Sequence, residues 1–571
     1  MSVADEYSFI IVELNCSHFC VFARTVPLSR GEIRILPSEM QGQKDLQSKK
    51  ADDIHLFVLV HGLWGEPNHM LTIEKAIKDV IGESSNERIE TLKISSFRFW
   101  KTLDGLKINA DRVIEDIFDR IKQCKTIHGC KVLKISIVGY SLGGLISRYA
   151  IGELYEIGFF EKVEPFAFTT FATPHLGVRY FNNNFFYNTM NKICPFIIGK
   201  TGLELFVIDK EKILVKMADS SSKYYKGLSK FLTVILLANI KNDRTVPFYS
   251  SFITEYSPFN SMASIKVKFF PNLFHTFIGD IKAKPRFVDL SKTEFKTPLD
   301  ESEIDEHKHE NTDMWGKVLG YPVFVIVLFL VLPMWIPFVT AACVTAAIFS
   351  WVKLPYIGEK DHNNQWRKIC IDTPKKGKDD KKDLSNLHDI RESDKRRIGS
   401  SLLSGSIFGQ NSFEGIMYAE EKLTGKPSRL EFLQENDKLN SELKQTWEDG
   451  SKKEKGDKQA FNTSKEPLIT TRMLSGEEFI ESSLIPLTEM SEKDFPLFKE
   501  QSKLPLEEAG KFMATSLKTL HWIRIPIFLN VWNAHDGIVC RRGPRSNPEG
   551  TSSIYLWAII LKHKLVGAFQ G

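Results

Sequence analysis

Several features that define other protein classes are missing or scarce in this sequence of 571 residues. Its eight cysteines form neither a C-x-x-C pair nor a dense framework. This spacing excludes a small disulfide scaffold and suits a reducing compartment, where the thiols behave as small core or surface groups. The cysteines are Cys16, Cys20, Cys124, Cys130, Cys194, Cys343, Cys370 and Cys540.

Positive and negative charges nearly cancel, since the formal net charge is only +5 over the whole chain. We therefore expect no nucleic-acid partner. No cluster of metal-ligating residues and no G-x-G-x-x-G fingerprint is present, so no cofactor is implied.

The first residues, Met1 to Glu6, are acidic and lack both a basic segment and a long apolar core. This start predicts no secretory signal.

One long hydrophobic run stands out against this background. Residues 318–352 carry no charge and are bounded by Lys317 and Lys353. One bilayer crossing takes about 20 residues and two take about 40, so the run fits neither well. Pro333 and Pro337 break it near the middle. A buried core helix of this length is uncommon. We predict a hydrophobic hairpin over 314–356 that anchors the protein to a membrane or lipid droplet.

The composition around this run predicts the remaining boundaries. Residues 1–50 are expected to form an N-terminal addition and 51–300 the first part of an α/β core. Residues 357–470 contain mixed-charge stretches without an apolar period, which is typical of a disordered linker. A basic anchor on anionic headgroups is the alternative, and the interspersed acidic residues argue against it. Residues 400–447 suggest no function, and 471–571 are expected to complete the core.

A candidate nucleophile lies where a strand meets a helix. The alternating, increasingly apolar segment 131–138 predicts a strand, and 142–155 predicts a helix. Between them stands Gly139-Tyr140-Ser141-Leu142-Gly143. Small residues two positions either side of Ser141 allow a sharp turn that exposes its Oγ. This pattern predicts a nucleophile elbow for acyl transfer.

A second motif follows a buried strand near the N-terminal side of the core. Residues 56–60 are nearly all apolar and run directly into His61-Gly62-Leu63-Trp64-Gly65. In an α/β-hydrolase the loop after this strand supplies one oxyanion donor, so we expect the backbone N–H groups of Leu63 and Leu142 to act together. The alternative is a tight turn without chemical function.

An acid is expected after the nucleophile and before the histidine in chain order. The apolar segment 231–239 predicts a core strand whose carboxyl end leads to Asp243. Sites of open α/β sheets gather at that edge. Asp243 would fix the histidine tautomer and stabilise the imidazolium. The alternative is a turn aspartate ahead of Pro247.

Three histidines remain for the base. The others after Asp243 lie in acidic or charged stretches or near the C-terminus; they are His307, His309, His362, His388 and His563. His535 follows 523–532, a predicted last strand, which is where the hydrolase order places the base. His521 precedes that strand and would lie at the wrong edge of the sheet. His275 follows 266–270 and remains the second choice.

The position of the hydrophobic run constrains this assignment. It lies between Asp243 and His535. A single bilayer crossing would separate the two residues, so the triad requires an even number of crossings or a shallow hairpin. A droplet monolayer, which has no second aqueous face, suits such a hairpin.

The same stretches resemble a known family. His61-Gly62-Leu63-Trp64-Gly65, residues 139–144, 171–177, 242–247 and the His535 loop are similar to the fungal serine-esterase family of lipases, and within it to the lipid-droplet phospholipases of budding yeasts. The resemblance implies an α/β-hydrolase fold with Ser141 as nucleophile, Asp243 as acid and His535 as base. Pro174, His175 and Gly177 are expected to shape a loop at the site.

Together these observations predict a serine hydrolase that cleaves fatty-acyl esters of lipids. Phospholipid as the substrate, and a location on the lipid droplet or the cytosolic face of the endoplasmic reticulum, are carried by the resemblance. Two alternatives remain open. An acyltransferase would use the same acyl-enzyme, and a non-catalytic droplet or membrane protein would keep the scaffold for binding.

Overall fold

The computed structural model describes residues 53–82, 88–181, 185–270, 273, 276–278, 281–296, 345, 348 and 490–567. The predicted N-terminal addition, charged linker and hydrophobic hairpin lie outside the described residues, apart from Thr345 and Ile348. No helix in the described part of the chain is long and apolar enough to cross a bilayer.

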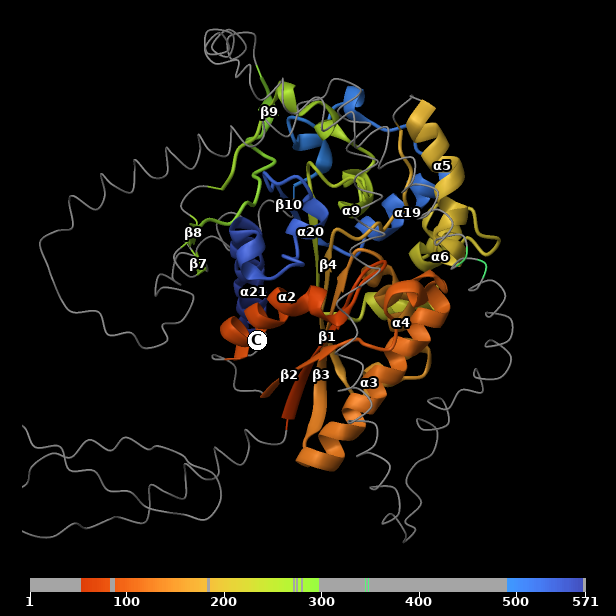
Figure 1. Ribbon diagram of the computed structural model, residues 1–571, viewed down its shortest axis with the longest axis vertical. Coiled ribbons are helices and arrows are strands. Elements are labelled where there is room, and N and C mark those ends of the chain that lie inside the picture. Colours follow the sequence, from red (N-terminus) through yellow and green to blue (C-terminus); the bar gives the residue numbers. More distant parts are fainter. Residues whose placement is uncertain are drawn as a thin grey trace, which may run out of the picture. The chain divides into compact units, whose positions relative to one another are not determined.

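A six-stranded sheet forms the centre of the fold, with every neighbouring pair of strands parallel (Figure 1). The strand order is β10-β5-β4-β3-β1-β2. Strands that are covered on both faces consist of nearly continuous apolar runs, as β1 and β5 do. The bounds are β1 Asp53–Val60, β2 Arg88–Lys93, β3 Lys131–Tyr140, β4 Glu164–Phe171, β5 Thr233–Asn239 and β10 Ile523–Ile527. Two short antiparallel pairs are β6 (Ile265–Lys266) with β9 (Glu294–Phe295) and β7 (Thr276–Ile278) with β8 (Ile281–Ala283).

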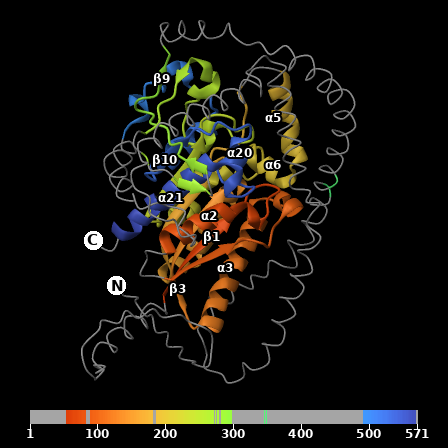
Figure 2. The ribbon, with the colours of Figure 1, turned by 60° about the vertical axis from the view of Figure 1, so that its left-hand side comes forward.

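Helices cover both faces of this sheet (Figures 1 and 2). α3 and α4 pack together against β3, whereas α21 packs with α2 on the other face. There Trp557 of α21 stacks edge-on against Phe171, and its indole N–H donates to Thr169 Oγ1 at 3.2 Å. The helices are α2 Leu71–Ala76, α3 Leu106–His128, α4 Leu142–Glu156, α5 Phe185–Ile197, α6 Gly199–Leu205, α7 Ile213–Ala218, α8 Lys223–Leu228, α9 Phe248–Ser251, α19 Glu508–Lys518, α20 Ala534–Gly537 and α21 Pro548–Gly567.

The last strand is shorter than its apolar sequence predicts. β10 ends at Ile527 and not near residue 532. The Phe528 N–H donates to Arg286 O at 3.1 Å, in the segment that also pairs with Pro526 and Ile527 on the side of β10 away from β5. Pro526 lacks an N–H and is tolerated here because β10 is an edge strand.

The strand order changes direction between β1 and β3. The chain adds β2 on one side of β1 and then places β3, β4, β5 and β10 successively on the other side. Ligands of open α/β sheets bind outside the carboxyl ends of the strands at such a switch point. The carboxyl ends of β1 and β3 lead to His61 and Ser141, the two motifs that the sequence singles out.

Candidate active site

Ser141 is the single residue between β3 and α4. Its backbone has φ 55° and ψ −127°, a strained conformation for a residue with a side chain. The Ser141 N–H donates to Phe171 O at 2.8 Å, and the hydroxyl of Thr173 donates to Ser141 O at 2.9 Å. The neighbouring strand β4 and the loop after it therefore hold the strained turn in place.

Close backbone approaches explain two of the glycines in this turn. A Cβ on Gly139 would lie 2.4 Å from the Gly144 Cα, so strand and helix can meet only without side chains there. A Cβ on Gly62 would lie 2.7 Å from the Ser141 Cβ. The Gly62 loop therefore passes directly against the candidate nucleophile.

A chain of two hydrogen bonds connects Ser141, His535 and Asp243. The Ser141 hydroxyl lies 3.0 Å from His535 Nε2, and His535 Nδ1 lies 2.9 Å from Asp243 Oδ2. All three side chains are nearly buried, with Ser141 8% and His535 2% exposed. With the Nδ1 proton donated to the carboxylate, Nε2 is free to accept the serine proton. These residues thus have the geometry of a nucleophile, a base and an orienting acid.

The Asp243 carboxylate is held in its ionised form. Burial alone raises its pKa, but the electrostatic attraction and hydrogen bond of His535, together with hydrogen bonds from Asn239 and Val246, outweigh this effect and lower the pKa below its ordinary value. Asp243 Oδ1 accepts from the Val246 N–H at 2.9 Å and from the Thr245 hydroxyl at 3.0 Å. A fixed negative charge therefore faces the imidazole.

Two further polar residues orient the histidine, and sequence reasoning missed both. Asn239 donates from Nδ2 to Asp243 Oδ2 at 2.9 Å and to Ala534 O at 3.1 Å. The Tyr140 hydroxyl donates to His535 O at 3.0 Å. The position of Asn239, a polar residue at the end of an otherwise apolar strand, was a usable signal. The partner of Tyr140 was not visible in the sequence because it lies 395 residues away.

The two backbone amides expected to bind an oxyanion lie at the same cavity as Ser141 and His535. Leu63 and Leu142 both line that cavity. Leu142 is the first residue of α4, where the N–H groups of a helix have no partner within the helix. Neither amide N–H makes a hydrogen bond to another described residue. The positive end of the α4 dipole adds to the attraction for a negative oxygen.

The histidines of the two flanking motifs are buried and neutral. Burial lowers the pKa of His61 to about 4, and its Nδ1–H donates to Gly62 O at 3.1 Å. Burial also lowers the pKa of His175 well below its ordinary value, and His175 Nε2 lies 3.0 Å from Thr170 Oγ1. Both side chains shape loops at the site, and neither makes a hydrogen bond to Ser141.

Arg148 supports the His175 loop and was also missed. It is 1% exposed and donates to His175 O at 3.4 Å and to Met217 O at 3.1 Å. Burial lowers the pKa of its guanidinium to about 9. A charged residue in the middle of an apolar helix was the available signal. Pro174, at the start of the same loop, lines the cavity at Ser141.

The two alternative candidates for the base, His521 and His275, are not placed beside Ser141 in the described structure. His521 is exposed ahead of β10 and lines a different cavity, away from Ser141. His275 lies outside the described residues.

An apolar cavity adjoins the three-residue chain. Besides Ser141 and His535, its wall is mostly apolar or aromatic and comes from the loops after β1, β4 and β5 and from α5 and α6. Three of the lining residues, Trp64, Cys194 and Ile198, form a separate buried cluster together with Leu103. A fatty-acyl chain is a chemically suitable occupant of such a wall. No group of three or more potential metal ligands was found among the described residues.

The parallel sheet, the strained serine turn and the serine–histidine–aspartate chain define an α/β-hydrolase fold with the geometry of a serine-hydrolase site. Residues 50–255 match the family described as "Putative serine esterase (DUF676)". The match covers 206 of the 571 residues, and over this segment the predicted resemblance to a serine-esterase family is confirmed.

Two curated relatives carry lipase names. "Putative lipase C4A8.10" of Schizosaccharomyces pombe is 31% identical over 208 residues, and "Putative lipase ROG1" of Saccharomyces cerevisiae is 31% identical over 209 residues. Each match covers 34% of this chain, and the matches cover 26% and 28% of those proteins respectively. The chain thus spans little more than a quarter of the length of these relatives.

Two solved structures show weak similarity. Phospholipase PlaB from Legionella pneumophila, in complex with thio-NAD, has a TM-score of 0.23 and 16% identity over 35% of this chain and 41% of that chain. An extracellular α/β-hydrolase from a Paenibacillus species has a TM-score of 0.14 and 16% identity over 21% of this chain and 40% of that chain. Scores this low bear on neither fold nor function.

Proposed function

We propose that this protein is a membrane- or droplet-associated serine hydrolase that cleaves fatty-acyl esters of lipids. The observation that carries the proposal is the hydrogen-bonded chain from Ser141 through His535 to Asp243 beside an apolar cavity. An ester carbonyl placed against Ser141 would have its acyl chain in apolar surroundings.

The reaction follows from the roles that this geometry allows. His535 Nε2 takes the hydroxyl proton as Ser141 attacks the acyl carbonyl, and Asp243 stabilises the resulting imidazolium. The Leu63 and Leu142 amides donate to the tetrahedral oxyanion. His535 then returns the proton to the leaving alcohol, which releases the first product. A water molecule, deprotonated by the same histidine, attacks the acyl-enzyme and frees the fatty acid.

The membrane or droplet location is part of the proposal and depends on the sequence. The uncharged run over 318–352 supplies an anchor of suitable composition. Because Asp243 and His535 are hydrogen-bonded in one site, that run must begin and end on the same side of a membrane. A hairpin on the cytosolic face of the endoplasmic reticulum or on a lipid droplet meets this condition. Phospholipids as preferred substrates are proposed from the sequence resemblance.

The test is a product analysis with purified full-length protein and the Ser141→Ala variant. Phosphatidylcholine, triacylglycerol and a lysophospholipid are each supplied in mixed micelles, with and without a long-chain alcohol as competing acceptor. We expect free fatty acid from a phospholipid, and a loss of roughly 10⁵-fold in turnover for Ser141→Ala. Ser221→Ala, which changes an exposed serine, is the matched control. Transfer of the acyl group to the alcohol in place of water would instead identify an acyltransferase.

Labelling with a fluorophosphonate probe tests the nucleophile without any choice of substrate. We expect labelling of the wild type and of Ser221→Ala but not of Ser141→Ala. Undiminished labelling of Ser141→Ala would assign the nucleophile to another serine, and absence of labelling in the wild type would favour a non-catalytic scaffold.

A further inference from the structure

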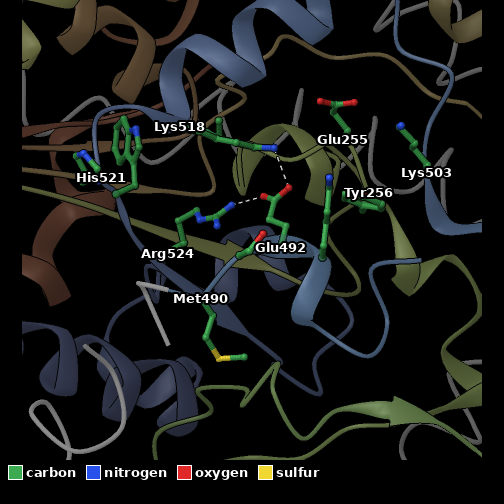
Figure 3. Close-up of a pocket in the computed structure, with 12 residues that line it drawn as sticks. Glu255, Tyr256, Met490, Glu492, Lys503, Lys518, His521 and Arg524 are labelled. Atoms are coloured by element: carbon green, nitrogen blue, oxygen red, sulfur yellow. Dashed lines mark hydrogen bonds and ion pairs between the residues drawn. The ribbon is translucent and has the colours of Figure 1, made fainter. Parts of the chain in front are cut away.

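A second cavity lies at the opposite end of β10 from the His535 loop. Its volume is about 400 Å³, within the range of small-molecule sites. The cavity is formed by the residues after β5, the segment that begins at Met490, the end of α19 and the start of β10 (Figure 3). It shares no lining residue with the Ser141 cavity. Its lining residues are Ile253, Glu255, Tyr256, Met490, Ser491, Glu492, Lys493, Lys503, Lys518, His521, Trp522 and Arg524.

Positive charge dominates this wall. Among the described residues that line the cavity there are four cations and two carboxylates, which leaves an excess of two positive charges; the cations are Lys493, Lys503, Lys518 and Arg524, and the carboxylates are Glu255 and Glu492. A cavity with low-dielectric walls and charge of one sign concentrates ions of the opposite sign. The wall therefore favours an anionic ligand.

Glu492 fixes two of the cations in the cavity. Its side chain is only 9% exposed, and one oxygen accepts from Lys518 Nζ at 2.7 Å. The other oxygen pairs with the guanidinium of Arg524 (Figure 3). That guanidinium also lies over the Phe252 ring, 5.1 Å from its centroid. Both cations are thus held in place before any ligand arrives, which reduces the entropy lost on binding.

Donor capacity remains after these contacts. A lysine ammonium carries three N–H donors and a guanidinium carries five. Lys518 and Arg524 each donate one hydrogen bond to Glu492, and neither makes another to a described residue. Lys503 adds an exposed ammonium whose nearest described carboxylate partner, Glu500, is 4.0 Å away. Lys493 forms no ion pair within the described residues. Several N–H donors can therefore converge on one multidentate acceptor.

We propose that this cavity binds the phosphate group of a ligand, separately from the ester-cleaving site. Phosphate carries negative charge and several acceptor oxygens, which match a planar guanidinium together with mobile ammonium groups. A phospholipid headgroup and free inorganic phosphate share this chemistry. The neighbouring Trp522, which is 3% exposed, supplies an optical reporter in the cavity wall.

The experiment uses full-length protein carrying Ser141→Ala, so that no lipid is consumed. Inorganic phosphate is titrated against tryptophan fluorescence, and flotation measures binding to phosphatidylcholine vesicles with and without phosphatidic acid. Lys493→Gln/Lys503→Gln removes the two exposed lysine charges of the cavity and leaves the ion pairs of Glu492 intact. Lys493→Arg/Lys503→Arg retains the charge, and Lys511→Gln changes an exposed lysine outside the cavity.

We expect the double glutamine variant to weaken phosphate binding about tenfold or more, because hydrogen bonds to charged groups are lost. The arginine variant and Lys511→Gln should bind like the parent. A loss confined to phosphatidic-acid vesicles identifies a lipid headgroup, whereas a loss in the phosphate titration with unchanged flotation identifies free phosphate. Equal binding by all variants in both assays overturns the proposal.

This proposal stands apart from the proposed hydrolase function. Hydrolysis of a soluble short-chain ester is measured with the native serine at position 141. It should be the same for the wild type and for Lys493→Gln/Lys503→Gln. Loss of that activity would mean that the substitutions disturb the fold, and the binding result would then count against the proposal.

Discussion

The Nε–H of Arg541 donates to His69 Nε2 at 3.0 Å, across 472 residues of sequence. The same guanidinium donates to Asp536 Oδ1 at 3.1 Å. His69 lies in the turn just after the Leu63 loop, and Asp536 follows His535 in α20. Burial, reinforced by the charge of Arg541, lowers the pKa of His69 to about 2, so its ring stays neutral and can accept. Arg541 thus connects the loop of one expected oxyanion donor to the helix of the proposed base.

We expect Arg541→Gln to slow turnover by about ten- to a hundredfold, because small displacements between reacting groups are costly. The loss should appear mainly in kcat and in the rate of fluorophosphonate labelling, with KM little changed. Arg542→Gln, at an exposed neighbouring arginine, is the matched control. If Arg541→Gln lowers only the thermal stability and leaves kcat intact, Arg541 has a purely structural role.

The three histidines can be separated by substitution. His535→Ala should reduce turnover about as severely as Ser141→Ala, because such residues act as a unit. His521→Ala and His275→Ala should retain most activity, since His521 lines another cavity and His275 is expected only as the second choice. Steady-state kinetics on a soluble ester with all three variants checks this. If His275→Ala loses turnover severely and His535→Ala keeps it, the base is His275.

Glu204 predicts a pH dependence of stability. Burial raises the pKa of this α6 carboxyl from 4.5 to about 7, and it accepts from the Leu106 N–H at 2.7 Å. A raised pKa in the folded state adds stability that is fully present below the unfolded value and is lost as pH rises through about 7. We expect the melting temperature of the wild type to fall between pH 4.5 and 7.5 more than that of Glu204→Gln.

Thermal melts across this pH range, with Glu508→Gln as an exposed control, provide the measurement. At pH 7.5 Glu204→Gln should be the more stable protein, by an amount on the order of a few kcal/mol at most. Parallel pH profiles for the wild type and Glu204→Gln would mean that the buried carboxyl does not titrate as described.

The hydrophobic run remains a prediction from sequence, and protease protection tests it. Epitope tags near Lys296 and near Lys382 should both be digested by protease added to intact microsomes or droplets, because the proposed triad needs both ends on one side. Replacing residues 318–352 with a short Gly/Ser linker should release the protein into the soluble fraction and preserve hydrolysis of a soluble ester. Protection of one tag alone would mean a single crossing, which the contact between Asp243 and His535 does not allow.

Much of the fold could be predicted because its signals are local. The apolar run ending at Val60 and the strand before Ser141 appear as β1 and β3, and the predicted helix after Ser141 appears as α4. Ser141 itself was identifiable because a sharp turn needs small neighbours at fixed spacing. The last strand was predicted too long, because its end depends on the pairing with β5, which stops at Ile527, and not on local sequence.

Local sequence was enough to predict the types of the elements and the order of the candidate residues, since backbone preferences and apolar periodicity act over a few neighbours. His535 and Asp243 are 292 residues apart in the sequence. They come into contact because β10 pairs with β5 in parallel, which brings the carboxyl ends of the two strands to one edge of the sheet. The contacts of Asn239, Tyr140 and Arg541 arise in the same way. Their partners are chosen by packing between distant segments, and no local pattern encodes that choice.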